Sequence, residues 1–226
     1  IALWHSGNNP AKWKRQGMFI SDGTDPRYDW QGFVPHDQKP HMKNPSRGYI
    51  GSANQHPTTS DYPYFLSEFY WASFRWNQIH TRLDTLQSAT INDMLDIQLD
   101  NRSVFAEKNM PVILRTWKNN LKNNIEKQAF TILSDWDYEM DGHSPAPTMY
   151  RYWYTLLEEL TWEDDLGKDN ENFIWPYRDK MMELILTDPE SHWFDDKTTS
   201  QTETFSHLSQ QAFHIMVSEL QNKYGD

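Results

Sequence analysis

One residue in this sequence that could do chemistry is Asn54, in the segment NPSRGYIGSANQHP (residues 44–57). An asparagine amide can donate hydrogen bonds to a negative charge that develops on a substrate oxygen. Asparagine is also a common turn residue whose side chain bonds to nearby backbone. The prolines, glycines and small residues around Asn54 suit both interpretations, and from the residues alone the turn is the simpler one.

A second stretch, Asp135–His143 (DWDYEMDGH), has the carboxylate spacing of the first half of a calcium loop. A calcium-binding EF-hand loop also needs glycine at its sixth position and glutamate at its twelfth. Met140 and Ala146 occupy these two positions. We therefore expect a turn whose acidic side chains cap the next helix, and no metal site.

The histidines and the usual nucleophile patterns form no clear catalytic cluster. His80 and Asp84 could share one helix face, but two ligands without a third are weak evidence for a metal, so we expect a surface pair. Packing or exposure accounts equally well for His36, His41, His207 and His214. No serine lies in a G-x-S-x-G elbow and no glycine-rich phosphate loop is present. The absence of cysteine excludes a thiol nucleophile, disulfides and thiolate zinc sites.

The elements that must position these residues fall into two parts. Residues 1–60 are rich in glycine and proline, which predicts loops with short strands at 1–5, 33–34 and 49–52. Residues 61–226 show helical periodicity. Helices are expected at 91–109, beginning with a capping box of Thr90 and Asp93, from Pro111 onward, and at 148–162, 177–186 and 202–224. The acidic stretch 161–172 is expected to be a solvated loop. The predicted fold is mainly α with an irregular, β-containing lead-in, divided into domains at 1–60 and 61–226.

Composition narrows the class of protein. A net charge of −11 argues against nucleic acid as a partner. No run of about eighteen apolar residues is present, so no membrane span is expected. The chain begins at Ile1 without a methionine or signal peptide, which we interpret as a piece of a longer or processed chain.

Several motifs, in order along the chain, resemble the β chain of the penicillin acylase family. The first runs through residues 28–57, with Trp30, Gly32, Pro35, Pro40, Asn44, Pro45, Gly48, Tyr49, Ile50, Ala53 and Asn54 as matching positions. Others follow at Arg75 and Ile79, at Asp93, Met94, Ile97, Gln98, Asp100, Ser103 and Ala106, and across residues 133–153. The resemblance covers most of residues 1–165. The combination is specific, although each motif alone is weak.

The resemblance implies an N-terminal nucleophile hydrolase of αββα architecture that cleaves amide C–N bonds, with a link to antibiotic biosynthesis. In this family a serine exposed by self-cleavage attacks the carbonyl, using its own α-amine, of pKa about 8, as base. An acyl-enzyme forms and is hydrolysed. That serine lies outside this chain, so the chain alone is expected to be inactive.

The resemblance also assigns roles to two residues. Asn54 matches the side-chain donor of the oxyanion hole, and Arg75 matches an arginine that supports it. The backbone donor of the hole lies outside this chain. Gln55 replaces a second asparagine of the family pattern, and Phe65 or Leu66 stands where some members have a calcium-binding acid. We therefore expect no cofactor in this chain, with calcium possible in the full-length protein.

Implied partners are the rest of the precursor (the α chain and the N-terminal part of the β chain) and a small N-acyl amide, with no nucleic acid or membrane. A periplasmic or extracellular location is implied as well. Acyl and amine specificity remain open. The alternative is a non-catalytic module that binds carbohydrate or another small ligand on the aromatic stretch Glu68–Trp76 (EFYWASFRW).

Overall fold

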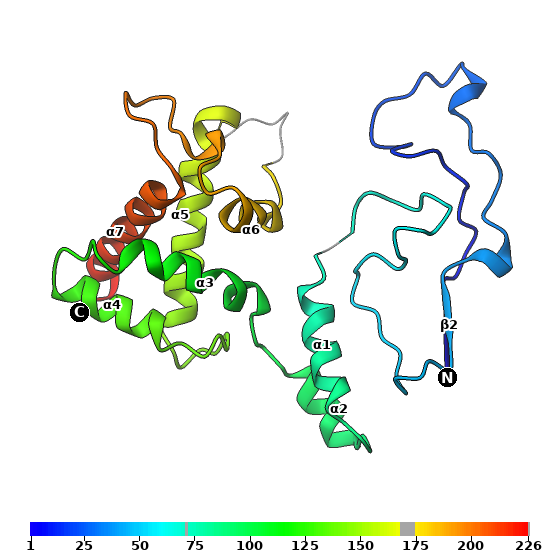
Figure 1. Ribbon diagram of the computed structural model, residues 1–226, viewed down its shortest axis with the longest axis horizontal. Coiled ribbons are helices and arrows are strands. Elements are labelled where there is room, and N and C mark those ends of the chain that lie inside the picture. Colours follow the sequence, from blue (N-terminus) through cyan, green and yellow to red (C-terminus); the bar gives the residue numbers. More distant parts are fainter. Residues whose placement is uncertain (71, 168–174, 226) are drawn as a thin grey trace. The chain divides into compact units, whose positions relative to one another are not determined.

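The computed structural model describes residues 1–70, 72–167 and 175–225, which form two compact units, Ile1–Leu99 and Asp100–Asp226. The first unit is largely irregular and the second is helical (Figure 1). The predicted class, mainly α behind an irregular and β-containing lead-in, is confirmed. The first α-helix begins at Phe74, and the compact units divide after Leu99. The domain division at residue 60 stays a prediction.

A single two-stranded ribbon organises the start of the first unit. Strands β1 (Ala2–Trp4) and β2 (His41–Lys43) pair antiparallel, with Leu3 opposite Met42. The strand expected at residues 1–5 is therefore confirmed. The one expected at 33–34 is reduced to an isolated bridge between Pro10 and Phe33, and the one expected at 49–52 is wrong, because that segment is irregular. Two single 3₁₀ turns, Pro26–Tyr28 and His36–Gln38, complete this lead-in.

Two helices end the first unit: α1 (Phe74–Asp84) and α2 (Ile91–Gln98). The capping box predicted for α2 is confirmed. The Asp93 amide donates to Thr90 Oγ1 at 3.2 Å, and the Thr90 amide donates to Asp93 Oδ2 at 2.7 Å. These bonds satisfy two of the backbone donors that a helix start leaves without partners.

The helix expected at 91–109 is wrong in its extent, because a second cap interrupts it. Ser103 Oγ accepts from the Ala106 amide at 3.1 Å and starts helix α3 (Val104–Trp117). Pro111, predicted as the first residue of a helix, instead lies inside α3. A side-chain cap placed earlier in the sequence thus determined the helix start, rather than the proline.

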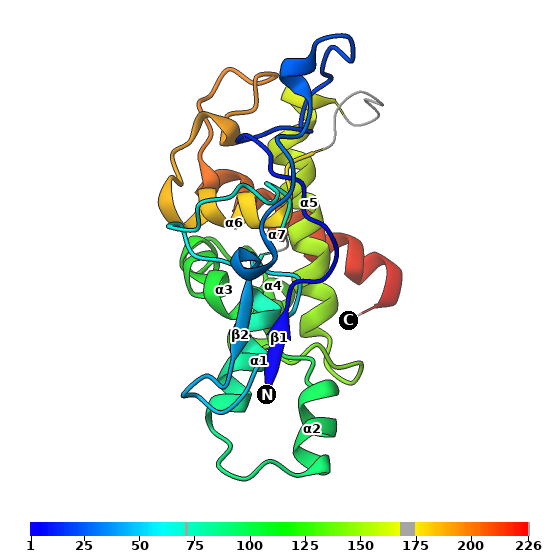
Figure 2. The same ribbon diagram turned by 90° about the vertical axis from the view of Figure 1, so that its right-hand side faces the viewer.

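Four more α-helices build the second unit: α4 (Asn124–Ser134), α5 (Ala146–Leu166), α6 (Arg178–Thr187) and α7 (Phe205–Tyr224), with a 3₁₀ turn at His192–Phe194. Helices α5 and α7 pack against each other and against α4, and α7 packs against α3 (Figure 2). Trp153 of α5 also contacts Trp117 of α3. The core between them is rich in large side chains: Met110, Ile113, Trp117, Leu133, Trp153, Leu157, Phe205, Leu208 and Phe213. Gly225, with φ of 87°, ends α7 as predicted.

Helix α5 is longer than the sequence predicted. It continues to Leu166 and ends at Gly167, whose φ of 75° a glycine adopts without strain. The expectation of a solvated loop at 161–172 is wrong over its first half, because Thr161 and Trp162 are helical and buried in the core. Residues 168–172 lie outside the described residues.

Candidate functional site

The segment 44–57 owes its irregular shape to backbone positions that reverse the chain. The Gly48 amide donates to the Pro45 carbonyl at 3.0 Å, which closes a tight turn with Arg47 near its tip. Gly48, Asn44 and Asn54 all have positive φ, at 78°, 44° and 67°. Glycine and asparagine are the residues that adopt this left-handed conformation most readily. The turn explains why no strand forms here.

The side chain of Asn54 is exposed, and within the described residues it makes no hydrogen bond. The neighbouring backbone is satisfied by another residue, since the amide of the buried Ala53 donates to Gln55 Oε1 at 2.7 Å. A turn asparagine commonly bonds to its own nearby backbone. The positive φ of Asn54 fits the turn interpretation, while its unengaged amide remains able to donate to a ligand.

Asn54 lines a cavity of about 850 Å³ within the first unit. The walls come from the β1–β2 ribbon, from residues 47–59, and from aromatic side chains that follow, including Phe69, Tyr70 and Trp76. This volume lies in the range of small-molecule sites, which combine apolar walls with a few polar groups. The cavity is therefore the candidate functional site of the chain.

Helix α1 holds the segment in place at two points. Gly51 lies so close to Trp76 that a Cβ there would meet the Trp76 ring at 2.7 Å. The Tyr49 hydroxyl lies 3.1 Å from His80 Nδ1 and donates to Asp84 Oδ1 at 3.2 Å. His80 and Asp84 thus share a helix face, as the sequence indicated, and both of them contact Tyr49.

The same contacts keep the Tyr49 phenol protonated. Burial, together with the Asp84 carboxylate, raises the pKa of Tyr49 above its ordinary value. Tyr49 therefore acts as a hydrogen-bond donor that fixes the segment to the helix.

The close approach of Gly51 to Trp76 gives a first prediction. In the full-length protein, Gly51→Ala is expected to lower the free energy of unfolding by about 1–3 kcal/mol, because the new methyl group must displace a rigid ring. Denaturant unfolding measures the effect.

Gly23→Ala is the matched control for this prediction, because a Cβ at Gly23 meets nothing within 4 Å and its φ is not left-handed. A Gly51→Ala protein as stable as the Gly23→Ala protein would contradict the proposed contact. Combining Gly51→Ala with Trp76→Leu should recover part of the stability, because the smaller side chain frees the space.

Arg75 lies on α1 with its side chain exposed, and within the described residues it contacts neither Asn54 nor the cavity. Its neighbour Trp76 lines the cavity instead, and consecutive helical residues point in different directions. The supporting role of Arg75 stays a prediction. The arginine that does line the cavity is Arg47, which the sequence reasoning did not single out.

The remaining histidines have local partners. Trp4 stacks on His41 and His36, with ring centroids 4.1 and 5.3 Å away. On α7, His207 Nδ1 accepts from the Thr204 amide at 3.1 Å as part of the helix cap. His214 Nδ1 lies 2.9 Å from the buried Glu126 carboxylate.

The acidic stretch Asp135–His143 forms turns with its own backbone. Asp137 Oδ1 accepts from the Glu139 amide at 3.0 Å, and Asp141 accepts from the His143 amide. The prediction that these acids cap the next helix is wrong, because α5 begins after Pro145 without a side-chain cap. Among the described residues, no three His, Asp or Glu side chains are grouped so that they could hold a metal.

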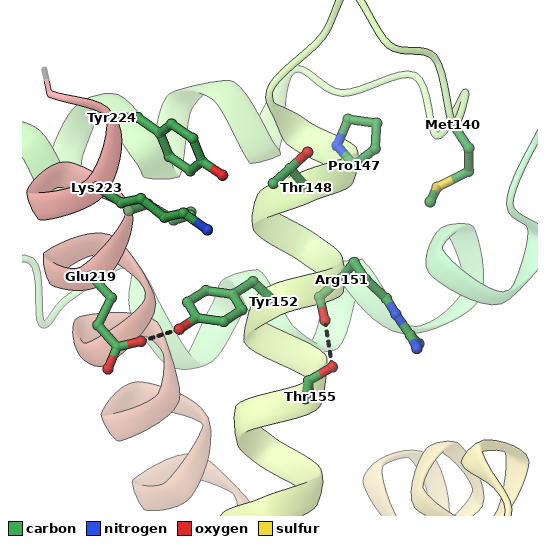
Figure 3. Close-up of a pocket in the computed structure, with 10 residues that line it drawn as sticks. Met140, Pro147, Thr148, Arg151, Tyr152, Thr155, Glu219, Lys223 and Tyr224 are labelled. Carbon is green, nitrogen blue, oxygen red and sulfur yellow. Dashed lines mark hydrogen bonds between the residues drawn. The ribbon is translucent and has the colours of Figure 1, made fainter.

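A second cavity, of about 450 Å³, lies between α5 and α7 in the helical unit (Figure 3). Its acidic side chain, Glu219, is engaged, because it accepts a hydrogen bond from the Tyr152 hydroxyl across the helix pair. Its walls are mainly apolar, with Met140 and Leu220 among them. No group of side chains suited to catalysis is apparent there, and the Asn54 cavity remains the stronger candidate.

None of the helices in the described ranges combines the length and apolar character that crossing a bilayer requires.

An irregular segment that presents an unengaged amide to a cavity, followed by a helical unit, fits the class of protein that the sequence motifs indicated. The family model described as Penicillin amidase matches residues 1–226. The chain therefore belongs to the penicillin amidase family, and the family resemblance seen in the sequence is confirmed.

Relatives with established names are similar at low identity. An acyl-homoserine lactone acylase QuiP from Pseudomonas syringae pv. tomato is 24% identical over 212 residues, covering 85% of this chain and 26% of the relative. The penicillin acylase 2 proenzyme of Pseudomonas sp. (strain SE83) is 24% identical over 153 residues, covering 67% of this chain and 19% of the relative. The chain thus spans about a quarter or less of the length of these relatives.

Among solved structures, a thermostable penicillin G acylase from Alcaligenes faecalis is similar, with a TM-score of 0.63 and 15% identity. The match covers 87% of this chain and 40% of that one. It shows that the two share a fold.

Proposed function

We propose that the full-length protein is an N-acyl amide hydrolase in which Asn54 supplies one donor of the oxyanion hole. The observation that carries this proposal is the Asn54 amide, which lies at a cavity and makes no hydrogen bond within the described residues. Membership of the penicillin amidase family supports the class of reaction. Two similar proteins are named as acylases of different compounds, which supports an amide substrate but leaves the acyl group open.

The proposed reaction follows acyl-transfer chemistry. A serine from the part of the protein outside this chain attacks the amide carbonyl carbon, and its α-amine takes the hydroxyl proton. The carbonyl electrons move onto oxygen, where the Asn54 Nδ2–H group would donate a hydrogen bond to the resulting oxyanion. Collapse of the intermediate breaks the C–N bond, and the amine leaves with the transferred proton. Water then hydrolyses the acyl-serine and releases the acid.

The surroundings of Asn54 suit this role because they fix its backbone before charge develops. The turn at Pro45–Gly48 and the contact of Gly51 with Trp76 restrain the segment that leads to Asn54. A donor that is already oriented costs no reorganisation when the oxyanion forms. Arg75 is proposed to support Asn54 in the full-length protein, and calcium, if it binds there, would use residues outside this chain.

The rest of the precursor is the proposed partner of this chain. Large apolar side chains of the first unit are exposed, among them Phe19, Ile20, Trp30 and Phe33. Trp30 and Phe33 are neighbours, with ring centroids 6.4 Å apart, and contiguous exposed apolar side chains are typical of an interaction site. We propose that other parts of an αββα assembly cover these residues, and that the mature protein is periplasmic or extracellular.

The direct test expresses the full-length precursor and follows its self-cleavage by mass spectrometry. Phenylacetyl and fatty-acyl anilides are then supplied, and release of the aniline is measured. The mature protein is expected to hydrolyse at least one of them, while the 226-residue chain alone releases aniline only at the uncatalysed rate. Hydrolysis by the chain alone would contradict the assignment of the nucleophile to another segment.

A second candidate, a carbohydrate-binding module, rests on the aromatic side chains of the same cavity. Phe69, Tyr70 and Trp76 line it, and sugar faces stack on such rings. Trp71, which belongs to the same aromatic stretch, lies outside the described residues. Binding of sugars without hydrolysis of any anilide would favour this alternative.

A further inference from the structure

Arg47 lines the same cavity as Asn54, and no carboxylate of the described residues pairs with it. Its Nε–H donates to the Tyr49 carbonyl at 3.1 Å. Its Nη2 lies 3.3 Å from the sulfur of Met42, and a thioether is a weak acceptor. The two terminal nitrogens of the guanidinium are therefore left without a strong acceptor.

The guanidinium is held in place by aromatic rings from two parts of the first unit. It lies 5.0 Å from the ring centroid of Tyr49 and 5.5 Å from that of Trp76. Stacking on ring faces fixes an arginine without neutralising its charge. The backbone supports this position, because Arg47 lies near the tip of the turn that Pro45 and Gly48 close.

Three other arginines of this acidic chain pair with carboxylates. Arg27 pairs with Asp25, Arg102 with Glu107, and Arg178 with Glu158, at 2.5 to 2.9 Å. The sequence carries 32 acidic and 21 basic residues, so acidic partners are abundant. A half-buried arginine that is stacked, oriented and left unpaired at a cavity is suited to binding an anionic ligand, because its planar fork matches a carboxylate in two-point geometry.

We propose that Arg47 binds a carboxylate on the amine half of the substrate and thereby sets specificity for anionic amines; this inference rests on the proposed hydrolase function. Polar side chains surround Asn54 in the cavity wall, among them Ser52, Gln55 and Thr58. A polar, charged amine half would keep its hydrogen bonds beside these side chains, while the aromatic walls of the same cavity, Phe69, Tyr70 and Trp76, would pack against its ring. The acyl chain is then bound by parts of the protein outside this chain.

Three chromogenic substrates test the proposal on the mature full-length enzyme. The first is the neutral phenylacetyl 4-nitroanilide, the second carries an added carboxylate on the aniline ring, and the third carries a carboxylate at the end of its acyl group. The quantity compared is the preference for the ring-carboxylate substrate, which is its kcat/KM divided by that of the neutral anilide. Arg47→Gln is expected to lower this ratio by about 10- to 100-fold, because it removes one charge-assisted contact. The change should be mainly in KM. Arg47→Lys should recover part of the ratio, because it keeps the charge but not the fork.

Arg27→Gln is the control for loss of one positive charge, because Arg27 is exposed and paired with Asp25. It should leave the ratio unchanged. An equal fall for all three substrates in Arg47→Gln would show a purely structural role and overturn the inference, as would an unchanged ratio. A fall confined to the substrate with the acyl carboxylate would overturn the assignment to the amine half. If the wild-type enzyme accepts only fatty-acyl anilides, the same three substrates are built on that acyl chain. An enzyme that hydrolysed neither kind of anilide would contradict the proposed function itself, and this inference with it.

Discussion

Replacing Asn54 by aspartate in the full-length precursor is expected to lower kcat about 10²- to 10³-fold, with a much smaller change in KM. The loss corresponds to about 2.7–4 kcal/mol of transition-state stabilisation, the usual contribution of one oxyanion-hole donor. Aspartate has the shape of asparagine but no N–H group, and its negative charge opposes that of the oxyanion. The substrate carbonyl before attack carries little charge, so substrate binding depends less on the donor.

The backbone of Asn54 requires a second variant, because its φ of 67° is left-handed. Asn54→Ala would remove the donor and strain the backbone together, at a cost of about 1–2 kcal/mol. Asn54→Gly removes the donor and keeps the conformation accessible. We therefore expect Asn54→Gly to lose activity about as strongly as Asn54→Asp while maturing normally and keeping its melting temperature.

Asn44→Gly provides the matched control, because Asn44 is another left-handed asparagine of the same segment, with φ of 44°. It should retain activity within about threefold of the wild type, since it removes no donor from the reaction. Full activity of a matured Asn54→Gly enzyme would contradict the role of Asn54 as an oxyanion donor. Asn54 would then be a turn residue. Mass spectrometry of the cleaved precursor separates failed maturation from failed hydrolysis.

Local patterns predicted local structure well. The capping box of Thr90 and Asp93 involves residues three apart, and the structure reproduces both of its hydrogen bonds. Gly225 ends α7 as expected for a glycine after a run of helical periodicity. Such features depend on a few neighbouring residues and on no distant contact, so the sequence is sufficient to predict them.

Predictions failed where two local signals competed. Pro111 is a plausible first residue of a helix, but Ser103 had already supplied a cap, and the helix runs through the proline. Residues 49–52 have strand-forming side chains, but the turn before them and the packing of Gly51 on Trp76 hold them in an irregular path. In each case the sequence contains both signals but does not show which of them is stronger.

The candidate site depends on contacts that no pattern in the sequence predicts. Asn54 was found only through resemblance to a family, because an asparagine between small residues is by itself most simply a turn. The structure adds that its amide is unengaged within the described residues. Arg47 was missed because its significance comes from distant partners, the Trp76 ring on α1 above all, and from the absence of a carboxylate near it in the described residues.

The second large effect is expected in the core of the helical unit, at Trp153. Its ring is fully buried between α3, α5 and α7 and packs edge to face on Trp117, with ring centroids 5.3 Å apart. Both indoles donate to the same carbonyl, that of Ser209, at 3.0 Å from Trp153 and 3.1 Å from Trp117. Trp153→Ala is expected to lower the free energy of unfolding by about 3–5 kcal/mol, because it leaves a large cavity at the point where three helices meet.

Two companion variants separate the contributions to this loss. Trp153→Phe keeps most of the apolar volume but removes the N–H group, while the Ser209 carbonyl keeps its hydrogen bond from Trp117. It should therefore lower the free energy of unfolding by about 1–3 kcal/mol, less than the alanine variant. Tyr224→Ala removes an exposed aromatic ring of the same unit and should change stability by no more than about 0.5 kcal/mol. Unfolding in urea, followed by circular dichroism at a helix-sensitive wavelength, measures all three. A Trp153→Ala chain within about 1 kcal/mol of the wild type would mean that the helices can close over the missing ring, and that the shared carbonyl of Ser209 does not hold α5 and α7 together.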